Sequence, residues 1–120
     1  MIRASIAAFN AHDTEALAAL YADDVKWFSV DSDKVSTEAE NRDAIRQWLI
    51  GYFKSVPDVH SEASGFVQTG IHVSFRERVG WTASGGVRLT QSSIAVYEVR
   101  RGKIKRVWYF PAAREPAATK

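Results

Sequence analysis

The segment from residue 87 to residue 110, VRLTQSSIAVYEVRRGKIKRVWYF, constrains the fold of this chain more than any other. It predicts two long β-strands joined by a tight turn at Arg101-Gly102-Lys103, because β-branched and aromatic residues fill both halves and glycine allows the positive φ of a short loop. Apolar residues fall on both faces, whereas a strand with one solvated face alternates apolar and polar residues. We therefore expect this hairpin to be covered on both sides, by helices of the chain and by a second subunit.

The length and composition fit one globular domain. The chain has 120 residues, 46% hydrophobic and 25% charged, which is enough for a single core and argues against wholesale disorder. We expect the domain to span residues 1–113 and the tail 114–120 to be disordered. The absence of cysteine excludes disulfides, thiolate zinc sites and cysteine nucleophiles. No apolar run approaches the ~20 residues of a membrane span, and no signal peptide is evident, so we expect a cytoplasmic location and no membrane partner.

One dense basic run straddles the hairpin turn. It comprises Arg100, Arg101, Lys103, Lys105 and Arg106. A solvated, charged hairpin tip explains such a run, and it also blunts pairing between sheet edges. Nucleic-acid binding needs a wider basic surface with interleaved aromatic residues, so we expect no nucleic-acid partner.

The first half of the chain predicts three helices. Ile2, Ile6 and Phe9 indicate a short amphipathic helix, and Asp13 or Thr14 caps a second one that buries Leu17, Leu20 and Tyr21. Asp23 and Asp24 are expected to end that helix, followed by a strand over 25–30 and a polar loop over 31–41. The clearest helical pattern follows, at Ile45, Trp48, Leu49, Tyr52 and Phe53.

The second half predicts a β-meander, with strands near 59–68, 71–82, 87–100 and 103–110 and turns at the intervening glycines. Helices followed by a run of strands indicate an α+β fold, with the helices on one face of the sheet.

Glu77 is the strongest candidate for chemistry. In the strand over 71–82, every second residue from Ile71 to Trp81 is apolar except this glutamate, so its side chain is expected to face the core. Four interpretations of this carboxylate stay open. It is paired with an arginine, hydrated at the rim of a cavity, or turned outward by a bulge in the strand. Alternatively, burial raises its pKa, which suits it to general acid–base catalysis. Gln91 and Ser93, on the next strand, could place hydrogen-bonding groups beside it. The three histidines have no metal-ligand spacing, so we expect no metal site.

The chain resembles the nuclear transport factor 2-like superfamily, nearest to its SnoaL-like and ketosteroid-isomerase-like branches. Four segments carry the resemblance: FNAHDTEALAALYADDVKW (9–27), NRDAIRQWL (41–49), PDVHSE (57–62) and VYEVRRGKIKRVWYF (96–110). The resemblance implies a cone-shaped α+β barrel in which three N-terminal helices pack on a strongly curved mixed sheet and enclose an apolar pocket. It also implies a homodimer through the outer sheet face, here at Ile94, Val96, Trp108 and Phe110.

The resemblance implies a pocket without the catalytic set of ketosteroid isomerases. Ser29, Ser5 and Ala95 stand where those enzymes have their base and their two oxyanion donors. The pocket positions that it implies for a small hydrophobic ligand are Trp27, Ser29, Trp48, Phe75, Gln91, Ser93, Val107 and Tyr109. It also places Glu77 toward the pocket, where the strand pattern makes this residue the acid–base candidate.

Three functions stay open on the sequence. The first is a cofactor-independent enzyme that acts on an apolar or aromatic metabolite by proton transfer, as an isomerase, cyclase or hydratase. The second is a non-catalytic binding protein for a small hydrophobic ligand. The third is a dimerisation or interaction domain whose pocket is filled by its own side chains.

Overall fold

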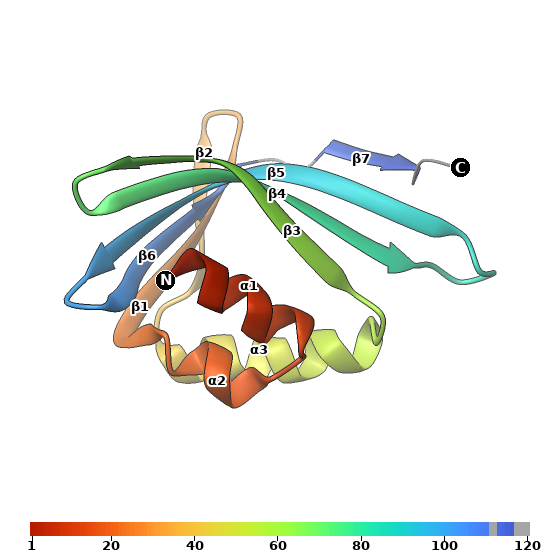
Figure 1. Ribbon diagram of the computed structural model, residues 1–120, viewed down its shortest axis with the longest axis horizontal. Helices are drawn as coiled ribbons and strands as arrows, with labels where there is room; N and C mark the ends of the chain where they lie inside the picture. The colour runs from red at the N-terminus through yellow and green to blue at the C-terminus, as the bar shows by residue number, and fades with distance from the viewer. Residues whose placement is uncertain (111–112, 117–120) are drawn as a thin grey trace.

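The computed structural model of the chain describes residues 1–110 and 113–116. Three helices come first, with one hairpin between the second and the third, and five strands follow (Figure 1). Their bounds are α1 Ile2–Asn10, α2 Thr14–Ala18, β1 Tyr21–Asp31, β2 Lys34–Ala39, α3 Arg42–Ser55, β3 His60–Thr69, β4 His72–Thr82, β5 Arg88–Arg100, β6 Lys103–Tyr109 and β7 Ala113–Pro116.

Two of the three helices, α2 and α3, begin at side-chain caps. The Asn41 side chain accepts a hydrogen bond of 2.8 Å from the backbone N–H of Ala44 at the start of α3, and Asp13 accepts one of 3.0 Å from Ala16 at the start of α2. Ile45 and Leu49 of α3 are buried against the core, as the apolar spacing predicts. No helix in the described part of the chain is long and apolar enough to cross a membrane.

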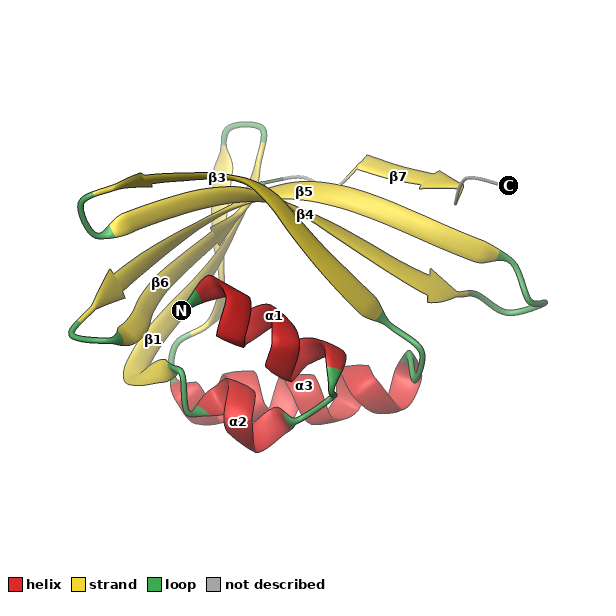
Figure 2. Ribbon diagram, in the orientation of Figure 1, coloured by secondary structure: helices red, strands yellow, loops and turns green. Residues whose placement is uncertain are grey.

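The strands form one curved, mixed sheet, with the helices gathered beneath its concave face (Figure 2). Its order is β2-β1-β6-β5-β4-β3, and β7 pairs with β5 beside this path. The pairing of β1 with β6 is parallel, and the other pairings are antiparallel. The predicted α+β fold, three helices on a strongly curved sheet in a cone-shaped arrangement, is therefore confirmed. The cone is open, because β2 and β3 do not pair with each other.

The β5–β6 hairpin forms as predicted. Its two-residue turn has positive φ at Arg101 (52°) and Gly102 (75°), the conformation that suits the twist of the two strands. On the concave side Tyr97 and Val107 are buried, whereas Ile94, on the opposite face, is 56% exposed. The two faces of the hairpin thus lie in different environments within one chain.

The start of β1 corrects the sequence-based expectation. Tyr21 was expected to close the second helix and the two aspartates to end it, but all three belong to β1, and α2 ends at Ala18. Tyr21 pairs in register with Ile104 of β6. Asp23 forms an ion pair with Arg42, and Asp24 with Lys105, so tertiary contacts hold two acidic residues on a strand.

The polar segment 31–41 is likewise not all loop. Lys34–Ala39 forms β2, which pairs with β1 through a tight turn at Ser32 and Asp33, where Ser32 has a φ of 56°. An edge strand tolerates this polar sequence because only one neighbour and one face need covering. Near the chain end, Ala113–Pro116 forms β7, which overlaps the expected disordered tail 114–120 at residues 114–116. Residues 117–120 of that tail lie outside the described residues.

Most side chains of the basic run at the hairpin turn form ion pairs or hydrogen bonds within the chain. Lys105 pairs with Asp24, Arg100 and Arg106 pair with Glu98, and the Lys103 ammonium donates to the carbonyl of Ala19 at 2.6 Å. The charge of this run therefore balances acids of the same domain.

Candidate functional site

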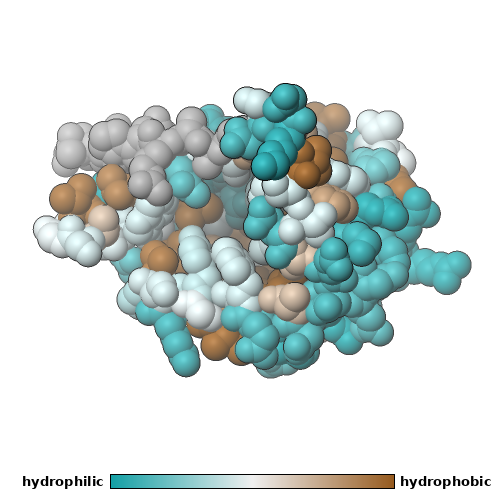
Figure 3. Space-filling model, turned by 180° about the vertical axis from the view of Figure 1, so that it is seen from behind, coloured by the Kyte–Doolittle hydropathy of each residue, from teal (hydrophilic) through white to brown (hydrophobic). Residues whose placement is uncertain are grey.

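A cavity of about 560 Å³ lies between the concave face of the sheet and the helices. The three helices wall it on one side, and β1, β2, β4, β5 and β6 on the other. A hollow is visible near the centre of the molecular face in Figure 3. The volume is within the range that holds a small organic ligand.

Seven of the nine sequence-predicted site residues line this cavity. They are Trp27, Ser29, Trp48, Glu77, Gln91, Ser93 and Tyr109. The other two, Phe75 and Val107, are not among its lining residues and are buried in the hydrophobic core behind it. The isomerase resemblance also assigned catalytic positions to Ser5 and Ala95. Ser5 lines the cavity, whereas Ala95 is part of the hydrophobic core.

Glu77 is held inside the cavity by two hydroxyl groups. Its side chain points inward from β4, as the strand parity predicts, and the residue is only 8% exposed. The Ser61 hydroxyl on β3 donates a hydrogen bond of 2.6 Å to Oε2 of Glu77, and the Tyr109 side chain is also hydrogen-bonded to the carboxylate. Within the described residues, no lysine or arginine forms an ion pair with it, so the partners are neutral.

Burial dominates the electrostatics of Glu77. Removal from water raises the pKa of its carboxyl above the ordinary value of 4.5, and the hydrogen bonds from Ser61 and Tyr109 oppose part of that rise. A buried carboxyl with a raised pKa can exchange a proton with a ligand closer to neutral pH than an exposed glutamate can.

A group of tyrosines continues the polar network from Glu77. The hydroxyl groups of Tyr97 and Tyr109 lie 2.9 Å apart, and Tyr97 is also hydrogen-bonded to Tyr21 and Ser5. Burial, followed by the nearby Glu77 charge, raises the pKa of Tyr97 and of Tyr109. Both phenols therefore stay protonated and act as neutral hydrogen-bonding groups.

The rest of the wall is aromatic. Trp27 meets Trp48 at a ring separation of 5.3 Å and an angle of 74°, and meets Tyr109 at 5.8 Å and 85°. Trp48 stacks on Tyr52, one turn further along α3, at 4.7 Å. Among the described residues, the buried indole N–H of Trp27 finds no hydrogen-bond partner, and its side chain is packed edge-on against neighbouring rings.

Two residues of the site were not predicted from the sequence: Tyr97, which lines the cavity, and Ser61, which is hydrogen-bonded to Glu77. Tyr97 lies on the same face of its strand as Gln91 and Ser93. The alternation that predicted those two as site residues could therefore have predicted Tyr97 as well. Ser61 carries no sequence signal, because its role depends on the register of β3 against β4. No group of three or more potential metal ligands occurs in residues 1–110 and 113–116.

Comparison with known proteins supports the fold and gives the family. No curated protein matches the chain significantly. An uncharacterised cystatin-fold protein from Novosphingobium aromaticivorans is 26% identical, with a TM-score of 0.77 over 92% of this chain and 94% of that one. IdmH, a putative polyketide cyclase from Streptomyces antibioticus, is 22% identical, with a TM-score of 0.77 over 95% of this chain and 88% of that one.

A third similar structure is a hypothetical protein with a ketosteroid isomerase-like fold from Catenulispora acidiphila, in complex with trimethylamine. It is 21% identical, with a TM-score of 0.77 over 92% of this chain and 83% of that one. The sequence profile of the SnoaL-like domain matches residues 2–107. With the fold and the cavity described above, this match shows that the chain belongs to the SnoaL-like domain family.

Proposed function

We propose that this protein is a cofactor-independent enzyme that moves a proton within an apolar or aromatic metabolite, in an isomerisation, cyclisation or hydration. The observation that carries the proposal is the placement of Glu77, a buried carboxyl with a raised pKa in the wall of a ligand-sized cavity. A purely structural carboxylate at this position would be expected to have a cationic partner.

In this reaction Glu77 acts as the proton carrier. Its carboxylate removes a proton from an acidic C–H or O–H group of the bound substrate or, in a hydration, from the water molecule whose oxygen adds to the substrate. The carboxylic acid so formed then returns the proton to another atom of the substrate. Ser61 and Tyr109 keep the carboxylate oriented, since both are hydrogen-bonded to it. Gln91 and Ser93 line the same cavity and can hydrogen-bond the charge that develops on the substrate.

The comparisons support the same class of reaction. The similar structure described as a putative polyketide cyclase comes from a protein of comparable length with the same fold. The aromatic walls made by Trp27 and Trp48 suit a flat, apolar substrate, because large aromatic side chains contribute much contact area.

An activated C–H probe tests the proposal without knowledge of the natural substrate. A nitrobenzisoxazole is a small neutral aromatic whose ring opens when a base removes one proton, with a change in absorbance. We expect the wild type to open it faster than buffer does and Glu77→Gln to lose about tenfold or more of that rate. Glu62→Gln is the matched control, because Glu62 is an exposed glutamate outside the cavity lining.

Two results would count against the enzyme. If Glu77→Gln and wild type open the probe equally fast, Glu77 is not the base. If both bind the probe and neither turns it over, the cavity is that of a binding protein, the alternative that the sequence left open.

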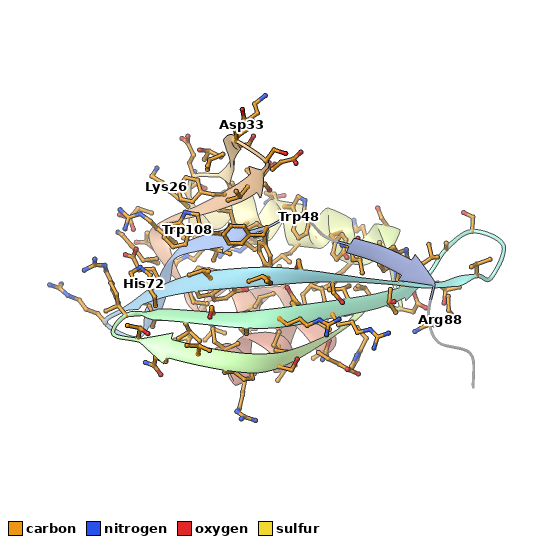
Figure 4. The ribbon with its side chains drawn as sticks, turned by 90° about the horizontal axis from the view of Figure 1, so that it is seen from above. Lys26, Asp33, Trp48, His72, Arg88 and Trp108 are labelled. Atoms are coloured by element: carbon orange, nitrogen blue, oxygen red, sulfur yellow. The ribbon has the colours of Figure 1, made fainter. Side chains whose placement is uncertain are left out.

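We further propose that the protein forms a homodimer through the outer face of the sheet. Ile94 is 56% exposed there, and Trp108 stacks on Phe28 of the neighbouring strand at 5.7 Å on the same sheet (Figure 4). Val96 pairs in register with Trp108 and extends this apolar surface. Phe110, also expected at the interface, is among the residues that line the cavity.

Sedimentation velocity tests the dimer. We expect the wild type to sediment as a dimer and Ile94→Glu as a monomer, since a charge at an apolar interface opposes association. Val67→Glu is the control, because Val67 is equally exposed but lies on β3, at the edge of the sheet. A monomeric wild type would rule the interface out.

A further inference from the structure

The charged side chains that line the cavity are all acidic. They are Glu77 in the interior and Asp31 and Glu38 on the β1–β2 hairpin. In the described part of the chain, no lysine, arginine or histidine lines the cavity. A cleft that presents one sign of charge between apolar walls attracts ligands of the opposite sign and repels those of the same sign.

The β1–β2 hairpin carries Asp31 and Glu38 without internal partners. Both residues are exposed, and among the described residues neither forms an ion pair. Lys34 lies opposite Asp31 in the hairpin register but is not a lining residue. This contrasts with Asp23, Asp24 and Asp58, each of which has a basic partner.

Glu38 lies at a β-bulge in β2 and lines the cavity. The register between β1 and β2 shifts between Trp27 and Phe28, so that Trp27 pairs with Ala39 and Phe28 with Thr37. Glu38 is the extra residue of the bulge, and both it and Ala39 line the cavity.

The aromatic side chains nearby have the geometry that suits a cation. The rings of Trp27 and Trp48 stand at 74° with centroids 5.3 Å apart, so they form two walls of a corner. Trp48 is 49% exposed on α3 (Figure 4), an unusual position for an indole that has no role beyond the core. The negative face of an indole attracts ammonium groups, and several rings set at angles hold quaternary ammonium ligands.

We propose that the ligand of this cavity is an amine: an apolar or aromatic body bearing a protonated or quaternary ammonium group, which lies between Trp48 and the carboxylates of Asp31 and Glu38. The body then extends inward toward Glu77. This inference rests on the cavity being the ligand site, as the proposed function requires, but not on catalysis by Glu77. Ligands that bear a carboxylate should bind weakly, because the three acidic residues of the cavity repel them.

Three probes of similar shape test the charge preference. They are phenyltrimethylammonium, its neutral isostere tert-butylbenzene, and the anion tert-butylbenzoate. Binding is followed by NMR titration of the indole N–H signals of Trp27 and Trp48. We expect the cation to bind about tenfold more tightly than the neutral isostere, with the difference shrinking as salt is added, and the anion to bind most weakly.

Variants assign the preference to the two carboxylates. The double variant Asp31→Asn/Glu38→Gln is expected to weaken cation binding by roughly fivefold and to leave the neutral probe unchanged. Asp33→Asn is the control: it removes a charge from the same hairpin, at its tip (Figure 4), from a residue that does not line the cavity. Trp48→Leu, at a position that is 49% exposed, should reduce the cation's advantage over the neutral isostere.

Equal or tighter binding of the neutral isostere would overturn the inference, and so would a failure of all three probes to bind. A double variant that weakens both ligands equally would also overturn it, since shape would then explain the effect. Glu77→Gln should still bind the cation more tightly than the neutral isostere, because Asp31 and Glu38 remain. If the protein does not open nitrobenzisoxazole but still prefers the cation, the proposed enzymatic activity is wrong and the proposed amine ligand is supported.

Discussion

The Ser61 hydroxyl donates a hydrogen bond of 2.6 Å to Oε2 of Glu77, across the β3–β4 pair. Both residues are almost completely buried, at 1% and 8% exposed, so water cannot replace the bond if it is lost. A carboxylate in a low-dielectric site depends on such donors for whatever charge it keeps. The protonation of Glu77 is therefore set by a neighbouring strand as well as by its own.

Removal of that donor should shift the titration of Glu77. In Ser61→Ala the hydrogen bond that lowers the pKa of Glu77 is gone while burial remains, so the carboxyl should titrate at higher pH than in the wild type. The loss of a buried hydrogen bond should also cost about 1–2 kcal/mol of unfolding free energy at neutral pH. The carboxyl carbon signal of Glu77 in an NMR pH titration measures the first effect.

Ser64→Ala on the same strand serves as the control, because Ser64 is exposed. An unchanged Glu77 titration in Ser61→Ala would mean that Tyr109 alone sets the state of the carboxylate.

The pKa of Glu77 also predicts how stability depends on pH. A carboxyl whose pKa is raised by folding binds more protons in the native than in the unfolded state, so its contribution is largest in acid and is lost as pH rises. The window runs from the ordinary value of 4.5 upward through the raised native value. Each pKa unit by which the native value exceeds the unfolded value corresponds to about 1.4 kcal/mol of unfolding free energy.

Urea unfolding of wild type and Glu77→Gln over that pH range measures the effect. The unfolding free energy of the wild type should fall relative to the variant as pH rises, because glutamine has no charge to bury. If the unfolding free energies of wild type and Glu77→Gln changed with pH in parallel, Glu77 would have an ordinary pKa in the folded protein.

The elements that could be predicted from the sequence are those whose signals are local. The apolar spacing from Ile45 to Phe53 identified α3, and Gly102 between two β-rich runs identified the β5–β6 hairpin. Strand parity alone placed Glu77 on the inner face, since one register determines the direction of every side chain in a strand.

The features that were not predicted depend on contacts distant in sequence. Tyr21 is a strand residue because β6 pairs with it in parallel, a partner more than eighty residues away. Glu38 lines the cavity at a bulge in β2, and bulges leave little trace in an edge strand of polar residues. Phe75 shares the parity of Glu77 but packs in the core, because parity specifies a face of the sheet and not the extent of a cavity along it.

The two phenols beside Glu77 should be energetically coupled. The hydroxyl groups of Tyr97 and Tyr109 are 2.9 Å apart, and replacing either residue with phenylalanine leaves the other with one buried partner fewer. A double-mutant cycle should therefore show the pair costing less than the sum of the single variants, by about 0.5–1.5 kcal/mol. Equilibrium unfolding in urea gives the four free energies.

A cycle of Tyr97→Phe with Asp33→Asn, at the tip of the β1–β2 hairpin, should be additive and controls for general destabilisation. Additivity between Tyr97 and Tyr109 would indicate that the two hydroxyls do not exchange a hydrogen bond in solution.

Glu98 should show the opposite pH dependence to Glu77. It is 4% exposed, and although burial raises its pKa, hydrogen bonds from Arg100 at 2.6 Å and Arg106 at 2.8 Å outweigh this and lower the pKa below 4.5. A carboxyl with a lowered native pKa contributes stability above its unfolded pKa and loses it as pH falls through the native value. Glu98→Gln should therefore cost about 1–2 kcal/mol at neutral pH and much less in acid.

Salt and a second variant test whether the arginines cause this effect. Both guanidinium groups are partly exposed, so added salt should reduce the difference between wild type and Glu98→Gln. Glu77→Gln, measured in the same series, should give a difference of opposite slope with pH, which separates a carboxylate stabilised by cations from one held by neutral hydroxyls. Matching slopes for the two variants would show that burial, and not the partner chemistry, controls both carboxyl groups.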